Sequence, residues 1–166
     1  MDPLVIPSAA IPGPAPVSLT VPEDWIASAA PAVTAIALAP EREGHFRPNV
    51  VLTHARMPAD ADLALLASAG RQVVEALPEF TGGPDQITQH HGRPTVFREF
   101  AYRDPQTDLG LYQLQVQTLI PVGHELADLV TMSGTCSGSE LDVVPILRAI
   151  ADSLDSAPSA ETVPAS

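Results

Sequence analysis

Residues 111–120, LYQLQVQTLI, alternate between two kinds of side chain. Large or β-branched residues occupy the even positions, and Gln113, Gln115 and Gln117 occupy odd positions between them. Because successive side chains of a β-strand point to opposite faces, this pattern predicts a strand with one buried face. The three glutamines are expected on the other face, turned to solvent.

Tight turns separate this strand from its neighbours in the sequence. Three further stretches have strand-like composition: 86–90, 95–102 and 126–132. The segments HGRP (91–94) and DPQTD (104–108) between them are typical of turns. Short connections of this kind join antiparallel strands, so we expect an antiparallel arrangement after residue 85. Residues 133–139, which are mostly small, are expected to form a connection.

The first half of the chain adds strands and one helix, and a second helix ends the domain. The expected strands lie at 17–21, 33–38 and 49–54. A helix is predicted from Asp60 to Pro78, because apolar residues recur at spacings of three and four. Those residues are Leu63, Leu66, Val73, Val74 and Leu77. The last helix is expected over 142–154, with its regular part starting at Pro145.

This order predicts an α+β fold. We expect an antiparallel sheet of about six to seven strands with helices packed against it. Strands and helices do not alternate as they do in doubly wound nucleotide-binding folds. Residues 17–154 are expected to form one domain, with a flexible proline-rich arm at 1–16 and a disordered tail at 155–166.

Two short segments carry a resemblance to a known family. Pro22 and Trp25 form a Pro-x-x-Trp corner after the first strand, and RPNVVL (47–52) leads into DADL (60–63). With the element order, they resemble the PsbP-like α/β/α sandwich in its actinobacterial LpqN-type branch. The resemblance covers 17–154 and implies a non-enzymatic binding or accessory protein. Many LpqN-type proteins carry a signal peptide and a lipid-anchored cysteine, whereas neither is found at the start of this sequence.

Composition limits the partners and the location that we expect. The formal net charge is -12, all eight basic side chains are arginine, and such a field repels nucleic acid and anionic lipid. Mechanisms that need lysine are excluded. Residues 1–16 do not resemble a signal peptide, and no stretch is long and apolar enough for a membrane span. We expect a cytoplasmic protein, although secretion by a non-classical route stays open.

Cys136 lies in GTCSG (134–138), which matches the glycine-flanked nucleophile elbow of hydrolases. A helix that starts just after it would lower the pKa of the thiol. The hydrolase order requires a histidine after the nucleophile, and the last histidine is His124. An enzyme that uses Cys136 is therefore the weakest of three functional hypotheses, and we expect no enzymatic activity.

Histidines and arginines give no firm site. His90 and His91 are adjacent, so they would point to opposite faces of a strand and could not bind one metal together. Arg93, Arg98 and Arg103 share one predicted hairpin, where cross-strand pairing is the ordinary role. The sequence thus indicates neither a metal nor a cofactor.

The favoured hypothesis is a non-catalytic protein-interaction or accessory module with a protein partner. The expected interaction surface is the polar sheet face with Gln113, Gln115 and Gln117, or the loop at 41–48 with Arg47 and the following Asn49. The alternative is a carrier of a small hydrophobic ligand, with a closed apolar cavity of at least ~300 Å³ under the first helix.

Overall fold

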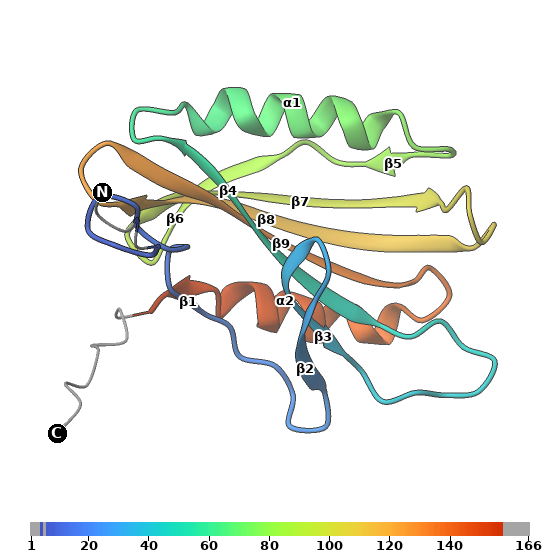
Figure 1. Cartoon of the computed structure of the whole chain (residues 1–166). Helices are drawn as coiled ribbons and strands as arrows, with labels where there is room; N and C mark the ends of the chain where they lie inside the picture. The colour runs from blue at the N-terminus through green and yellow to red at the C-terminus, as the bar shows by residue number, and fades with distance from the viewer. Residues whose placement is uncertain (1–3, 5, 158–166) are drawn as a thin grey trace, which may run out of the picture.

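The computed structural model describes Leu4 and residues 6–157, and one large antiparallel sheet forms its centre (Figure 1). Within those residues the sheet has eight strands, in the order β2-β3-β4-β9-β8-β7-β5, with β6 also paired to β7. A second sheet joins only β1 and β10. The predicted α+β fold with an antiparallel sheet is confirmed, and the sheet is slightly larger than expected.

The elements follow the predicted order with additions. The strands of the large sheet are β2 (Ile26–Ala30), β3 (Val33–Leu38), β4 (Asn49–Pro58), β5 (Thr81–Gly82), β6 (Gln86–His90), β7 (Arg93–Arg103), β8 (Gly110–Val122) and β9 (Leu126–Ser137). The small sheet holds β1 (Val17–Ser18) and β10 (Asp155–Ser156). The helices are α1 (Leu63–Glu75) and α2 (Val144–Asp152), and the short 3-10 helix η1 (Leu141–Val143) precedes α2.

β9 differs most from the prediction. We expected a connection over 133–139, but β9 continues to Ser137 and pairs with β8 as far as that residue. Its small side chains let the last helix approach: a Cβ on Gly134 would lie 3.1 Å from Leu147 Cδ2. The run of small residues is therefore a packing feature of a central strand.

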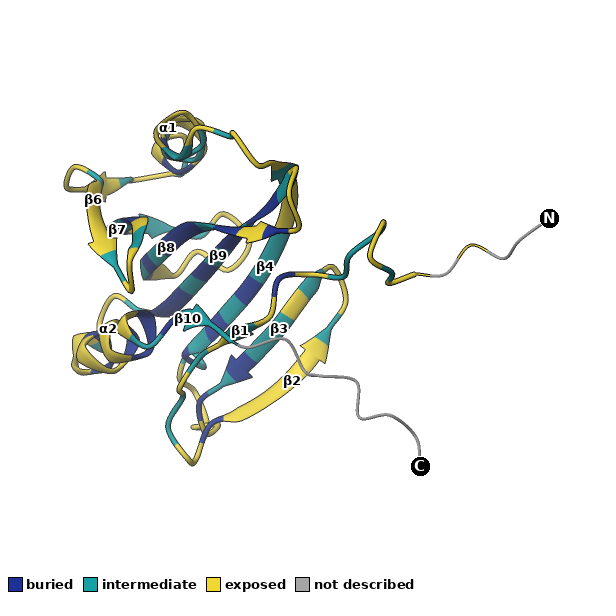
Figure 2. Cartoon of the chain, turned by 90° about the vertical axis from the view of Figure 1, so that its left-hand side faces the viewer, coloured by how far each residue is buried: buried dark blue, intermediate teal, exposed yellow. Residues whose placement is uncertain are grey.

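The two helices lie on opposite faces of the sheet (Figures 1 and 2). Even-numbered residues of β8 and β9, such as Val116 and Met132, point toward α2, and this side is called the α2 face. Odd-numbered residues of the same strands, such as Gln115 and Ser133, lie on the other side, called the α1 face. This is the expected α/β/α sandwich.

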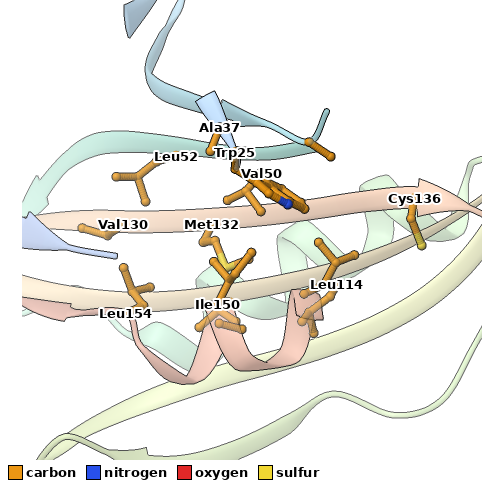
Figure 3. Packing of buried hydrophobic residues seen from close by; sticks show 14 of the residues in the cluster. Trp25, Ala37, Val50, Leu52, Leu114, Val130, Met132, Cys136, Ile150 and Leu154 are labelled. Carbon is orange, nitrogen blue, oxygen red and sulfur yellow. The ribbon is translucent and has the colours of Figure 1, made fainter. Parts of the chain in front are cut away.

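The main core lies between the sheet and α2. Val116, Val130, Met132 and Leu147 are all fully buried there. Trp25, on the predicted Pro-x-x-Trp corner, also joins this cluster (Figure 3). The backbone N–H of Trp25 donates to the Pro22 carbonyl at 3.0 Å. Burial of large apolar side chains is the dominant stabilising contribution to such a fold.

The N-terminal segment packs on the α2 face, although we expected a flexible arm over 1–16. Ala15 is buried, and its N–H donates to Asp128 Oδ2 at 2.7 Å. Arg56 donates to Asp128 Oδ1 at 2.6 Å and to the carbonyls of Pro12 and Gly13. Residues 12–16 are therefore fixed to the sheet, whereas residues 1–3 and 5 lie outside the described part of the chain.

The predicted boundary after residue 154 also shifts. Asp155 and Ser156 pair with β1, and Arg93 donates to the Ser156 hydroxyl at 2.7 Å. The remainder of the expected tail, 158–166, lies outside the described residues.

α1 begins where Asp62 caps it: its carboxylate accepts from the N–H groups of Ala64 and Leu65. Val74 is buried, as predicted. Val73, which we placed on the same stripe, is 70% exposed, because one residue rotates the side chain by about 100° around a helix.

Candidate functional site

The three glutamines of β8 lie on the α1 face, but they are not turned freely to solvent. Gln117 is buried, and Gln113 and Gln115 are half-buried, because α1 packs over β7 and β8. Gln115 accepts from Arg98 at 3.1 Å, and Gln117 donates to Thr131 at 3.3 Å. The expectation that all three face solvent is wrong. The alternation correctly predicted which face of the strand they occupy, but it could not predict that a helix covers this face.

A buried arginine holds α1 over these glutamines. Arg98 of β7 is 2% exposed and donates to both carboxylate oxygens of Asp85, at 2.8 and 2.6 Å. It also donates to the Ala67 carbonyl of α1 at 2.7 Å. Arg98, and secondarily Arg71, lower the pKa of Asp85 below its usual value, so the pair stays ionised. Arg98 keeps the expected cross-strand pairing, with Gln115 opposite it on β8, and in addition links the helix to the sheet.

The rest of the α1 face forms a surface without charged side chains, called the uncharged face below. By register it comprises alternate residues of four strands. They are Ile26 and Ser28 of β2; Ile36 and Leu38 of β3; Asn49, Val51, Thr53, Ala55 and Met57 of β4; and Leu129, Thr131, Ser133, Thr135 and Ser137 of β9.

Most of the uncharged face is accessible. Val51, Thr131 and Ser133 in the centre are half-buried, and Ile26 at the edge is 62% exposed. The helix on this side makes its contacts with β7 and β8, and α2 lies on the opposite face. The centre therefore offers hydroxyl groups beside aliphatic side chains to whatever approaches the sheet.

The predicted surface residues fall partly on this face. Asn49 lies beside Thr135, whose hydroxyl accepts from Gln113 at 3.3 Å, so the register brings Asn49 and Gln113 together. Arg47 does not join them: its Nε donates to the Ala39 carbonyl at 2.6 Å and braces the loop between β3 and β4. Sequence reasoning missed the hydroxyls of β9, although the alternation of TMSGTCS (131–137) was a readable signal.

Cys136 is placed for packing. The side chain is fully buried in the α2-face core, within a strand. Burial raises the pKa of the thiol to about 11, with smaller effects of Glu140 and Asp142. This is opposite to the activation that the nucleophile hypothesis required.

The rings of His90 and His91 lie 4.2 Å apart, centre to centre, so the expectation that these two residues point to opposite faces is wrong. His91 lies in the two-residue turn between β6 and β7 and contacts the Asp152 carbonyl at 3.1 Å. His54 is elsewhere, against the Ala15 carbonyl at 3.0 Å. In the described part of the chain no three histidine, cysteine or carboxylate side chains could hold a metal ion together.

Two cavities lie away from the uncharged face. A cavity of about 530 Å³ adjoins β7 and includes Glu99, Tyr112 and Arg148 in its lining. An apolar hollow of about 200 Å³ lies between residues 17–21 and strands β2 to β4. The carrier hypothesis expected an apolar cavity under the first helix of at least ~300 Å³, whereas this hollow is smaller and lies beside the N-terminal segment.

Comparison with solved structures identifies the fold. LpqN of Mycobacterium tuberculosis, described as involved in cell envelope biogenesis, aligns with a TM-score of 0.71 and 16% identity over 86% of this chain and 83% of that chain. The chain has the PsbP-like fold. Cyanobacterial PsbP (CyanoP) of Synechocystis sp. PCC 6803 aligns with a TM-score of 0.58 and 16% identity, over 87% of this chain and 95% of that one.

A third structure shares this PsbP-like fold. PA94 of Pseudomonas aeruginosa, a regulator candidate of unknown function, aligns with a TM-score of 0.61 and 15% identity over 87% of this chain and 99% of that chain. No protein-family model and no curated protein sequence matches the chain. In the described residues, neither helix is long and apolar enough to cross a membrane.

Proposed function

We propose that this protein is a non-catalytic accessory protein that binds a protein partner through the uncharged face. The partner surface is itself uncharged and offers aliphatic side chains together with hydrogen-bonding groups. The observation that carries the proposal is the lack of any charged side chain on this half-open face of a protein with a net charge of -12.

Charge distribution supports a contact surface. The centres of protein–protein interfaces are depleted in charged residues, because a charge buried without a partner is costly. A surface that only needed to remain soluble would carry some of the 20 acidic side chains of the chain. A charged group on a partner would find no counter-ion at Val51, Thr131 or Ser133, so the partner is expected to be uncharged there.

The geometry of the face also supports docking. Three neighbouring strands form a flat surface of half-buried side chains. The aliphatic Ile26 and Ile36 lie toward its β2 edge. Arg98 and Asp85 fix α1 beside the face, so a partner would meet a preformed surface. LpqN, which has the same fold, is described as involved in cell envelope biogenesis, and an accessory role fits that description.

The non-catalytic part of the proposal has separate support. The one thiol is buried, and burial raises its pKa to about 11. The uncharged face carries hydroxyl and amide groups but no general acid or base, which most hydrolytic mechanisms need.

Site-specific photo-crosslinking tests the proposal. Benzoylphenylalanine in place of Ile26 should crosslink a partner in the native lysate, to be identified by mass spectrometry. The matched control carries the same group at Gln106, in the exposed turn between β7 and β8. In the Ile26 background, Ser133→Arg should lower the crosslink yield about tenfold or more, because it places an unpaired charge in the interface.

Three outcomes would contradict the proposal. One is equal crosslinking from the Ile26 and Gln106 positions, and another is a yield that Ser133→Arg leaves unchanged. A crosslinked product made of two copies of this chain would replace the partner with self-association. Thr53→Arg serves as a second charge variant, and circular dichroism must show that each variant is folded.

A further inference from the structure

β2 is the open edge of the large sheet (Figure 2). In the described chain no strand pairs with its outer side. Its sequence, IASAA, has neither charge nor proline, and four of its five residues are exposed. Charges, prolines or breaks normally blunt such an edge, because an open edge pairs readily with another chain. The other end of the sheet is broken in this way, since residues 83–85 separate β5 from β6.

The hydrogen bonds of β3 fix the direction of its backbone groups. In an antiparallel ladder, opposed residues alternate between pairs that exchange hydrogen bonds and pairs that do not. The Ala39 N–H donates to the opposed Pro48 carbonyl at 2.9 Å, in register with the β3–β4 ladder. Every second residue of β3 counted back from Ala39 therefore directs its backbone groups to β4. Ile36 and Leu38, which lie between, direct theirs to β2.

Ala27 is the residue of β2 that turns its backbone outward. Ile26 and Ser28 stand opposite Leu38 and Ile36, so their N–H and C=O groups point into the sheet. Ala27 lies between them, and both of its groups therefore point away from β3, where an added strand could bind them. The register shifts after Ser28, so regular pairing covers only 26–28 and an added strand would gain few hydrogen bonds.

The apolar hollow of about 200 Å³ adjoins the same residue. Ala27 lines it with Ala35, Ala37 and the segment 17–21, and every lining residue is alanine, valine, leucine or isoleucine. A side chain directly opposite Ala27 on an added strand would lie on the same face, with its Cβ about 5 Å away. A branched aliphatic side chain at that position would pack into the hollow.

Acidic residues flank the edge. Glu23 and Asp24 come just before β2, and both are exposed. The net charge of the chain is -12, so its field adds to theirs. A basic residue at the matching end of an added strand would be attracted there, which favours one orientation of that strand.

A second copy of β2 fits this edge poorly. A two-fold antiparallel pairing that keeps both faces of the sheet continuous would place alanine against alanine on the side of the hollow, through Ala27 and Ala29 of each copy. No large side chain would then reach the hollow. The shape of the edge therefore favours a segment from a different protein.

We propose that β2 binds an extended segment of the partner as an additional strand. The segment places a branched aliphatic residue opposite Ala27 and a basic residue beside Glu23 and Asp24. The residues next to the aliphatic one are uncharged and extend the uncharged face beyond Ile26 and Ser28. This inference rests on the proposed function, because it describes how the same partner continues past the edge of that face. Main-chain hydrogen bonds supply affinity in this mode, and the side-chain pocket supplies specificity.

A synthetic peptide tests the added strand. The probe is TVTLTVK, acetylated and amidated, whose leucine stands opposite Ala27 when its lysine lies beside Asp24. It is titrated into the full chain while the backbone amides of 26–30 are followed by NMR. We expect saturable shifts with a dissociation constant on the order of 1 mM, and a downfield shift of the Ala27 amide as it gains a hydrogen bond.

Two altered peptides separate the contributions. Alanine in place of the leucine should lower the affinity about fivefold, because the hollow is no longer filled. N-methylation of the leucine removes the N–H that donates to the Ala27 carbonyl, and it should lower the affinity by about fivefold or more.

Variants of the chain locate the site. Ala27→Leu fills the hollow from β2 itself, so the preference for the leucine peptide over the alanine peptide should fall to about twofold or less. Ala29→Leu is the matched control: Ala29 is exposed on the same strand and face but does not line the hollow, so the preference should persist. Ser133→Arg, on β9, should leave peptide binding unchanged. A one-dimensional NMR spectrum checks that each variant is folded.

Four outcomes would overturn the inference. Without any saturable shift, β2 is not the site of an added strand; if the Ile26 crosslink still responds to Ser133→Arg, the proposed function stands without it. Equal affinities of the leucine and alanine peptides would remove the hollow from the site. Unchanged binding after N-methylation would remove the backbone pairing. A dimer of the free chain with a protected Ala27 amide would replace the partner segment with a second copy.

Discussion

The two helices of this protein are attached to the same sheet by different interactions. α2 packs through apolar side chains: Leu147 is fully buried, and Ile150 and Ala151 are nearly so. α1 lies over a polar part of the sheet, where Arg98 and Gln115 stand opposite it. Its attachment combines the buried side chains of Ala67 and Val74 with the ion pair of Arg98 and Asp85.

This difference concerns how strongly each helix depends on single residues. Apolar packing spreads its free energy over many contacts, so the loss of one side chain leaves a cavity but no uncompensated group. A buried ion pair depends on both members, because removal of one leaves the other desolvated and unpaired. The α1 attachment should therefore be more sensitive to one substitution and to pH than the α2 attachment.

The largest effect is expected for Arg98→Ala. Loss of the guanidinium leaves Asp85 without its main partner and opens a space under α1, so the free energy of unfolding should fall by about 4 kcal/mol. Urea unfolding at neutral pH measures this change. Arg103→Ala on the same strand is the matched control, since Arg103 pairs with Glu79 on the surface and its loss should change the free energy of unfolding far less. If the two variants lost a similar free energy of unfolding, the buried ion pair of Arg98 would stabilise the protein no more than a surface pair does.

Leu147→Ala should have the next largest effect. Truncation of this fully buried side chain leaves a cavity against β9 and should lower the free energy of unfolding by about 3 kcal/mol. Its neighbour Ile146 is 40% exposed, and Ile146→Ala should cost less than about 1 kcal/mol in the same urea series. A cost for Leu147→Ala well above that of Arg98→Ala would reverse the proposed comparison of the two helices.

The smallest effect is a pH dependence that separates the two attachments. The pKa of Asp85 is lowered in the folded state, so the stabilisation by its ion pair is present above the unfolded pKa and is lost as pH falls through the folded pKa. The stability difference between wild type and Arg98→Ala should therefore shrink from neutral pH to about pH 3, which is below the unperturbed aspartate pKa of about 3.9.

The stability difference between wild type and Leu147→Ala serves as the comparison at low pH. No titrating group is removed by that substitution, so its cost should change much less over the same pH range. Thermal unfolding followed by circular dichroism at several pH values gives both differences. A cost of Arg98→Ala that is constant with pH would mean that Asp85 contributes through packing and not through its charge.

The sequence patterns predicted the positions of the strands better than they predicted which elements pack over each strand. The alternation in 111–120 correctly predicted β8 and the separation of its two faces. It wrongly placed Gln117 in solvent, because a period of two cannot reveal a helix that arrives from another part of the chain. The partner of Arg98 was hidden for a similar reason: Asp85 stands in a polar connection, and nothing local indicates that it turns inward.

The N-terminal region shows the same limit. Val17, Leu19 and Val21 alternate, and all three do pack against the core. Only Val17 and Ser18 form a strand, with β10 as partner. The alternation reports which side chains are buried, but a strand also needs a backbone partner, and that partner comes from the far end of the domain.

The candidate site was predicted in part. Asn49 and Gln113 were named, and they do lie next to the hydroxyls of β9. Ser133 was missed, because residues 133–139 were interpreted as a connection, and Thr131 lies in the predicted strand at 126–132 but was not named as a surface residue. Arg47 was named with the loop at 41–48, and its hydrogen bond to Ala39 holds it in that loop, off the uncharged face.

The amino-acid sequence by itself determined the antiparallel sheet, its main strands and the two helices, because these follow from local periodicity and turn residues. Only the tertiary structure decided which face each helix covers, where Arg98 finds its counter-ion and which face remains free of charge. Those features depend on pairings between residues that are distant in the chain, and no local pattern encodes such a pairing.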